Sequence, residues 1–197
     1  MTDPAERIET EQAQLLLMAE RAERLRAGVT VPSSPTDQPD LAGASKQLAS
    51  LTGLVRDLSD EVLFRSAEAG PRTDHDRVMS AYTDAAQQAG EAVANYSTAY
   101  AELGFQHRYR GQGAGPDLRD AREHSFACIQ DRLDWTRDSL ADGATRLRPV
   151  AEDLGGTPAR TQASRCRTTQ MISGPHAQAV APAPPHHART RAPGRTR

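Results

Sequence analysis

The sequence predicts an all-α protein: a long-helix antiparallel bundle of three to four helices, followed by a disordered C-terminal tail. Aromatic residues make up only 4% of the 197 residues, and alanine is abundant, a composition that favours helices over an all-β fold. Long segments carry apolar residues at alternating spacings of three and four, which is typical of the seam of a helical bundle. The final 43 residues contain six prolines and few large apolar side chains, so they cannot bury enough surface to fold.

The first helix is predicted over residues 4–27. Asp3 is a suitable N-cap, Pro4 suits the first helical position, and Glu6 completes a capping box. A linker with three prolines follows over residues 28–39. Because this linker is long, the sequence leaves open whether the first helix docks on the others. Its apolar stripe consists of Ile8, Leu15, Met18, Ala22 and Leu25.

The second and third helices are predicted over residues 40–69 and 74–103, with Thr73 as the N-cap of the third. Only a short connection around Gly70-Pro71 separates them, so they must be antiparallel neighbours. Each carries an unbroken stripe with a mean period of 3.5 residues. The stripe of the second helix is Leu41, Ala44, Leu48, Leu51, Val55, Leu58 and Val62; that of the third is Val78, Tyr82, Ala85, Ala89, Ala92, Tyr96, Ala99 and Leu103.

The fourth helix is predicted over residues 116–154, after a loop at residues 104–115. Pro149 should kink the last turns or end the regular helix early, and Gly155-Gly156 should close the folded part. The predicted domains are therefore a bundle at residues 1–154 and a tail at residues 155–197. The stripe of this helix is Phe126, Ile129, Leu133, Thr136, Leu140, Gly143, Leu147, Val150 and Leu154.

Charge divides the chain in the same way. The 24 basic and 26 acidic residues give a net charge of −2, but residues 155–197 hold seven arginines and no acid. The remaining 17 basic and 26 acidic residues give residues 1–154 a balance of −9. Two cysteines cannot form a disulfide framework, and the longest apolar run is too short for a membrane span. We expect a cytoplasmic protein without membrane insertion.

Two groups of basic residues are candidates for binding anions. His107, Arg108 and Arg110 lie at the end of the third helix, where they could contact an anion; the alternative is that they cap the helix C-terminus. The arginines of the tail could contact a polyanion such as nucleic acid. These tail residues are Arg160, Arg165, Arg167, Arg189, Arg191, Arg195 and Arg197.

The sequence predicts no catalytic, cofactor or metal site. His124 and Cys128 share a helix face at a spacing that zinc can use, but no second pair completes a site. The glycine-rich stretch 111–115 follows no strand and lacks the Lys-Ser/Thr ending of a phosphate loop. The stripes also lack the Glu-x-x-His motifs of di-metal bundles. We therefore expect a protein that is not an enzyme.

Long amphipathic helices without a catalytic cluster favour a helical-bundle interaction or assembly protein. The run Leu15-Leu16-Leu17-Met18 has more apolar surface than one helix face can bury, and Leu54, Leu63 and Phe64 lie off the stripe of their helix. These residues predict self-association or a partner protein bound through apolar helix faces. The alternative is a nucleic-acid-associated protein that uses the basic tail for phosphate contacts. Trp135 could widen the core stripe or form an exposed contact point.

Overall fold

The computed structural model describes residues 4–67, 73–113 and 115–172, and within these ranges it contains four α-helices and no strand. The helices are α1 (Pro4–Gly28), α2 (Leu41–Ala67), α3 (Thr73–Tyr109) and α4 (Pro116–Ile172). The chain divides into two compact units, Met1–Arg160 and Thr161–Arg197. The bundle lies in the first unit, to which the following description refers.

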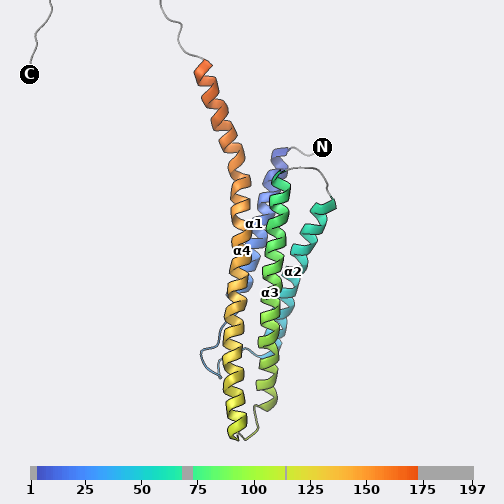
Figure 1. Ribbon diagram of the computed structural model, residues 1–197, viewed down its shortest axis with the longest axis vertical. Coiled ribbons are helices and arrows are strands. Elements are labelled where there is room, and N and C mark those ends of the chain that lie inside the picture. The colour runs from blue at the N-terminus through green and yellow to red at the C-terminus, as the bar shows by residue number, and fades with distance from the viewer. Residues whose placement is uncertain (1–3, 68–72, 114, 173–197) are drawn as a thin grey trace, which may run out of the picture. The chain divides into compact units, whose positions relative to one another are not determined.

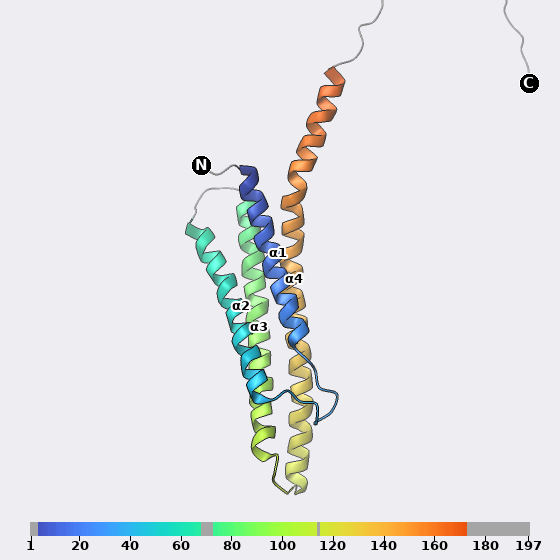
Figure 2. The same ribbon diagram turned by 180° about the vertical axis from the view of Figure 1, so that it is seen from behind.

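Polar pairs between neighbouring helices define an up-down-up-down bundle. As the residue number rises on α1 it falls on α2, and the same holds for α3 and α4, so each of these pairs is antiparallel. Figures 1 and 2 show that α1 and α4 also run in opposite directions, and Glu23 pairs with Arg148 between them. The all-α bundle is thereby confirmed, and α1 docks as its fourth member. The pairs are Glu11–Arg65 and Arg21–Asp57 for α1 and α2, Asn95–Arg132 and Arg77–Asp153 for α3 and α4, and Glu23–Arg148 for α1 and α4.

The buried face of α3 agrees with the stripe that its sequence predicts. All eight residues of its predicted stripe, from Val78 to Leu103, are buried. Its alanines allow a neighbouring helix to approach closely, and α4 does so at Gly143. A Cβ atom on Gly143 would lie 3.6 Å from the carbonyl oxygen of Ala85, so a small residue suits this crossing. On α4, Ile129, Leu133, Thr136, Leu140, Leu147 and Leu154 are buried as predicted.

The buried face of α2 is rotated from its predicted stripe. Leu54 and Arg65 are buried, so the prediction that Leu54 adds exposed apolar surface is wrong. Leu48, Val55 and Val62 of the predicted stripe are only partly buried. The cause is the docking of α1, because α2 then packs against α1 on one side and α3 on the other. The buried residues of α1 are Leu15, Met18, Ala19 and Ala22.

Two helices continue past the ends predicted from the sequence. Helix α3 runs through Gly104 to Tyr109, and α4 runs through Pro149 and past Leu154 to Ile172. The predicted loop at residues 104–115 and the predicted helix end at residue 154 are therefore corrected. Each glycine costs a helix only about 1 kcal/mol relative to alanine, and flanking contacts can outweigh that cost. Phe105 packs on Tyr109 across one such turn, with ring centroids 4.9 Å apart.

The predicted tail begins inside the helical backbone of α4, and its residues 173–197 lie outside the described residues. The linker between α1 and α2 spans residues 29–40, against a predicted range of 28–39, and it packs on the bundle. Val29 is buried, and Gln130 of α4 donates a 2.9 Å hydrogen bond to the carbonyl oxygen of Pro32. Asp40 caps α2 by accepting a 2.6 Å hydrogen bond from the backbone N–H of Gly43. This packing brings the linker close to the α3–α4 end of the bundle.

Candidate functional site

Exposed apolar side chains gather on α1 and α2. Among the described residues, four of the five exposed large apolar side chains lie on these helices, and Trp135 of α4 is the fifth. The four consecutive apolar residues Leu15–Met18 cannot all lie on one helix face, as predicted. Leu15 and Met18 are buried, whereas Leu16 and Leu17 are exposed. Leu63 and Phe64 of α2 are the most open, with 69% and 63% of their surfaces exposed.

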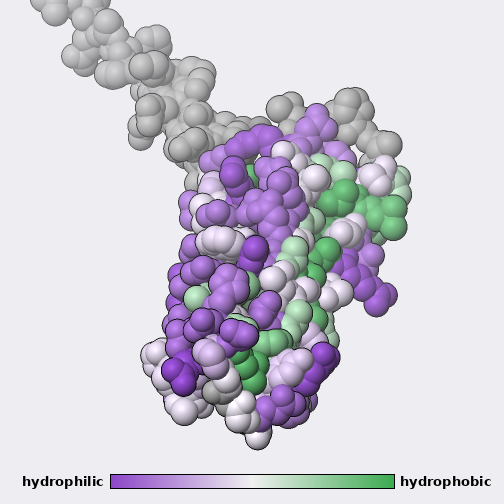
Figure 3. All heavy atoms as spheres, turned by 60° about the horizontal axis from the view of Figure 1, so that its bottom comes forward, coloured by the Kyte–Doolittle hydropathy of each residue, from purple (hydrophilic) through white to green (hydrophobic). Residues whose placement is uncertain are grey.

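Leu17 and Phe64 border the same seam between α1 and α2. Arg21 and Asp57 pair across this seam, and residues four or seven positions away lie on the same helix face. Leu17 precedes Arg21 by four residues, and Phe64 follows Asp57 by seven. Leu17 and Phe64 therefore both lie along the outer side of the α1–α2 seam. Leu63 precedes Phe64 in α2 and is exposed on the solvent side of that helix, beyond the seam. We name Leu17 and Phe64, together with Leu63, the α1–α2 apolar face. Figure 3 shows hydrophobic surface gathered at the upper right, on the side of the bundle where Figure 1 places α2.

Leu16 borders a different seam. Glu23 follows it by seven residues and pairs with Arg148 of α4, so Leu16 lies on the α4 side of α1. Its exposed fraction, 37%, is also the smallest of the five. Leu16 is therefore not part of the α1–α2 apolar face.

A buried charge cluster lies where α1, α2 and α3 meet. Arg65 is only 6% exposed, and its guanidinium group donates hydrogen bonds to the carboxylates of Glu11, at 2.5 Å, and Glu61. It also donates to the Tyr82 hydroxyl at 3.2 Å, and its Cζ atom lies 4.3 Å from the centre of the Tyr82 ring. One arginine thus joins α1, α2 and α3. Its only signal in the sequence is its position three residues after Val62 of the predicted stripe.

The environment of this cluster alters two pKa values. Burial acts to lower the pKa of Arg65, but its hydrogen bonds with Glu11 and Glu61 outweigh that effect and raise it. Burial raises the pKa of the Tyr82 hydroxyl above its usual value, against the opposing effect of the nearby Arg65 charge. Arg65 is therefore a permanent cation and Tyr82 stays protonated at neutral pH. Both suit a structural role for the cluster.

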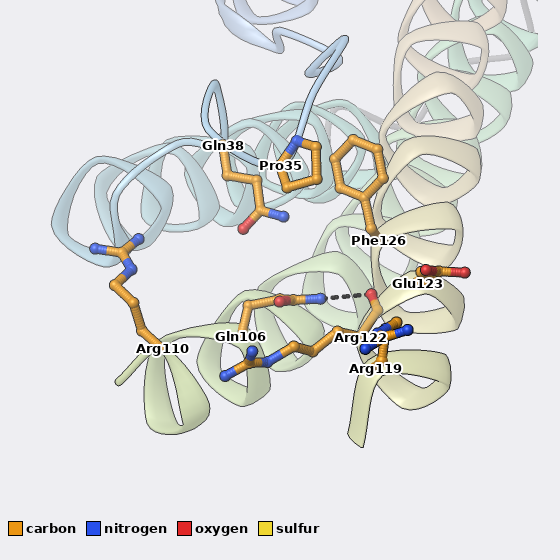
Figure 4. Close-up of a pocket in the computed structure, with 8 residues that line it drawn as sticks. All are labelled: Pro35, Gln38, Gln106, Arg110, Arg119, Arg122, Glu123 and Phe126. Carbon is orange, nitrogen blue, oxygen red and sulfur yellow. Dashed lines mark hydrogen bonds between the residues drawn. The ribbon is translucent and has the colours of Figure 1, made fainter. Parts of the chain in front are cut away.

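A second candidate site is a pocket of about 380 Å³ between the α1–α2 linker and the adjoining ends of α3 and α4 (Figure 4). Three arginines line it: Arg110 just after α3, and Arg119 and Arg122 in the first turns of α4. We name it the arginine pocket. The other lining residues are Gln38, Gln106, Pro35, Phe126 and, at the rim, Glu123.

Hydrogen bonds hold one wall of the arginine pocket in place. The guanidinium of Arg122 donates to the carbonyl oxygen of Tyr109, and Gln106 donates a 2.8 Å hydrogen bond to the carbonyl oxygen of Arg122. These contacts join the end of α3 to the start of α4. Arg122 is half-buried as a result, whereas Arg110 and Arg119 are exposed. Among the described residues, neither Arg110 nor Arg119 forms an ion pair with a carboxylate.

The structure separates the three residues predicted to contact an anion. Arg110 lines the arginine pocket, whereas His107 and Arg108 are exposed in the last turn of α3 and do not line it. Arg119 and Arg122 were missed by the sequence reasoning. Of the predicted polyanion contacts, Arg160, Arg165 and Arg167 belong to the helical backbone of α4, where their side chains are not described. Arg189, Arg191, Arg195 and Arg197 lie outside the described residues.

The remaining motifs form no site in the described part of the chain. Within these ranges no group of three or more His, Cys, Asp or Glu side chains is arranged to hold a metal ion. His124 is exposed and Cys128 is half-buried on the same helix. Trp135, half exposed, carries the guanidinium of Arg132 over its ring at 4.7 Å from the centroid. It belongs to the surface of α4 and not to the core.

Among the described helices, none combines the length and the apolar character that a membrane crossing requires. Comparisons with known proteins found no match for this chain, whether to a protein-family model, to a curated protein or to a solved structure. Function must therefore be argued from the α1–α2 apolar face and the arginine pocket themselves.

Proposed function

We propose that the protein is a non-enzymatic protein–protein interaction or assembly protein, in which the bundle uses the α1–α2 apolar face to bind a second copy of the chain. The observation that carries the proposal is the exposure of Leu17, Leu63 and Phe64 on neighbouring helices. Clustered exposed apolar side chains mark interfaces, because removing a contiguous apolar surface from water is favourable. Single exposed leucines are common on protein surfaces and do not have this meaning.

Charge supports a second copy as the occupant. Arg56 and Asp60 precede Phe64 by eight and four residues, so both signs of charge lie on the same side of α2 as the apolar face. In a two-fold symmetric contact, the Arg56 of each copy can approach the Asp60 of the other.

Sedimentation equilibrium of the full chain over a range of concentrations tests this proposal. We expect a reversible monomer–dimer equilibrium that is abolished by Phe64→Glu, which places a carboxylate on the apolar face. Trp135→Gln is the matched control, because it removes a comparably exposed aromatic side chain from α4. It should leave the equilibrium unchanged. The proposal is contradicted if the wild-type chain stays monomeric at all concentrations. It is also contradicted if Phe64→Glu and Trp135→Gln change the monomer–dimer equilibrium equally.

Nucleic-acid association through the tail is the alternative, favoured by the seven arginines and absent acids of residues 155–197. Its signature is binding to duplex DNA at low salt that falls steeply as the salt concentration rises. Self-association through apolar side chains lacks this steep dependence, so one salt series separates the two functions.

A further inference from the structure

A second stripe of uncharged residues runs beside the buried stripe of α3. It is displaced from the buried stripe by one residue and repeats at the same alternating spacings of four and three. Every member is half-buried or exposed, so the bundle itself covers this stripe only in part. The members are Met79, Thr83, Ala86, Gly90, Val93, Ser97, Tyr100 and Gly104.

Helix α2 carries a matching uncharged stripe on the side that faces α3. Gln47, Asp57 and Glu61 mark the flank of α2 that contacts α1, and this stripe lies on the opposite flank of the buried residues. Arg65 contacts Tyr82, so the antiparallel α2 and α3 bring their two stripes side by side along the outside of the seam. We name the two stripes together the α2–α3 face. The α2 members are Leu41, Ser45, Leu48, Thr52, Val55, Ser59, Val62 and Ser66.

The charged residues of α3 along this length, Asp84, Glu91 and Glu102, lie on its α4 side. Asp84 lines a pocket together with residues of α4, and Glu91 follows Asp84 by seven residues. Glu102 follows Asn95 by seven, and Asn95 pairs with Arg132 of α4. In Figure 3 the side on which Figure 1 places α4 is mostly hydrophilic, whereas pale and green surface lies toward α3 and α2. The α2–α3 face is therefore an uncharged side of a charged bundle.

The hydroxyl groups of the α2–α3 face have their hydrogen-bond partners within their own helices. Thr52 and Ser59 of α2 donate to the carbonyl oxygens four residues earlier, at 3.0 and 2.8 Å. Thr83 and Ser97 of α3 do the same, at 2.9 and 2.7 Å. Covering a donor costs free energy when it loses its partner, and these donors keep theirs. Another helix can therefore cover the α2–α3 face without leaving these hydroxyl groups unsatisfied.

Two glycines of the α2–α3 face have no packing role inside the bundle. A Cβ atom on Gly53 or Gly143 would lie within 4 Å of a neighbouring helix, whereas one on Gly90 or Gly104 would meet nothing within that distance. A glycine inside a helix is destabilising relative to alanine, so the bundle alone gives no reason for either residue. Glycine also allows another backbone to approach most closely. Gly90 and Gly104 are thus suited to contact with another chain.

We propose that the α2–α3 face of one copy packs against the α2–α3 face of a second copy. The proposal rests on the proposed function in taking a second copy as the partner, and it extends the contact beyond the α1–α2 apolar face. Leu63 joins the two surfaces, because it follows Val62 of the α2 stripe and is 69% exposed. The contact forms a second four-helix core, to which each copy supplies two stripes with a mean period of 3.5 residues.

Charge and area both favour a second copy as the occupant. Residues 1–154 carry a balance of −9, so two copies repel each other least across a surface that contains no carboxylate. At about 1.5 Å per residue, the stripe from Leu41 to Ser66 is roughly 40 Å long, and two packed helices are roughly 20 Å wide. The α2–α3 face thus covers roughly 800 Å², which is the area that each partner contributes to a stable protein–protein interface.

Sedimentation equilibrium of the full chain tests the α2–α3 face with a matched pair of variants. Thr83 on the face and Thr145 on α4 are both exposed, and each donates a 2.9 Å hydrogen bond to the carbonyl oxygen four residues earlier. Thr83→Glu brings a carboxylate from each copy into the contact and should weaken dimerisation at least about tenfold. Thr145→Glu adds the same charge outside the contact and should leave the dissociation constant unchanged.

A pair of glycine variants separates association from folding. Gly90→Gln and Gly156→Gln each place a better helix former where a Cβ atom meets nothing within 4 Å, so both should raise the melting temperature of the monomer. Only Gly90→Gln should also weaken dimerisation, because its side chain holds the two α2–α3 faces apart. Far-UV circular dichroism of each variant establishes that it is folded.

The outcomes separate this proposal from the proposed function. If Phe64→Glu dissociates the dimer but Thr83→Glu behaves like Thr145→Glu, the α2–α3 face is not an interface and the proposed function stands. If Thr83→Glu dissociates the dimer and Phe64→Glu does not, the α2–α3 face is the interface and the α1–α2 apolar face is not. A chain that is monomeric at all concentrations overturns both.

Discussion

Removing Arg65 should destabilise the bundle more than removing any exposed arginine. Arg65→Ala leaves the carboxylates of Glu11 and Glu61 without their shared cation and removes a donor to the Tyr82 hydroxyl. Breaking a buried ion pair from one side typically costs about 3–5 kcal/mol. The side chains of Glu11 and Glu61 retain 26% and 22% of their exposure, so water screens the abandoned charges in part. We therefore expect a loss of about 3 kcal/mol in the free energy of unfolding.

Urea unfolding followed by far-UV circular dichroism measures this loss directly. For a domain of this size, about 3 kcal/mol also corresponds to a fall of roughly 6–12 °C in melting temperature. Arg56→Ala is the matched control on the same helix. Its side chain is 81% exposed and pairs with Asp60 at 3.7 Å, so its loss should cost about 0.5 kcal/mol or less.

A compensating variant shows whether the abandoned charges cause the loss. Arg65→Met combined with Glu11→Gln and Glu61→Gln removes both the cation and the two anions, and should recover much of the stability that Arg65→Ala loses. A loss below about 1 kcal/mol in Arg65→Ala, or a triple variant no more stable than Arg65→Ala, would refute the reasoning.

Three other predictions follow from burial. Leu51→Asp or Leu133→Asp places a carboxylate at a fully buried position and should lower the free energy of unfolding by several kcal/mol; an unchanged urea midpoint would show that the side chain does not face the core. Burial raises the pKa of Tyr96 from 10.0 to about 12, so its neutral form stabilises the fold below pH 10 and this contribution is lost as the pH rises toward 12. Tyr96→Phe cannot ionise and should resist alkaline unfolding in that window, whereas equal pH profiles would contradict the shift. A chain ending after Gly156 should keep its melting temperature, because Leu154 is the last buried side chain in the part of the chain whose side chains are described; a fall of several degrees would show that later residues pack on the bundle.

The apolar stripe predicted α3 better than it predicted α2, and the reason is the number of neighbours that each helix has to satisfy. The stripe of α3 faces one continuous core, so a period of 3.5 residues identifies every buried position from Val78 to Leu103 except Ala81. On α2 the docking of α1 buries a second flank, which includes Arg65. A charged residue at a buried position is invisible to a hydrophobic pattern, because its burial depends on carboxylates that another helix supplies.

Helix ends were harder to predict, because a stop signal competes with packing that the sequence does not display. Gly104 and the Gly155-Gly156 pair predict helix ends, yet each helix continues through them. At the end of α3, the contact of Phe105 with Tyr109 and the bond from Gln106 to the carbonyl oxygen of Arg122 stabilise the extra turns. The signal of a glycine is local, whereas the contacts that override it come from another helix or a later turn.

The arginine pocket shows the same limit at the level of a site. Its residues come from three segments: the α1–α2 linker, the end of α3 and the first turns of α4. Sequence reasoning found Arg110 because it lies in a short basic run, but Arg119 and Arg122 lie among acids and resemble ordinary helix surface. Gln38 carries no signal at all until the linker packs on the bundle and buries its side-chain nitrogen. The three segments meet only in the folded chain, so the pocket that they form can be identified only from the structure.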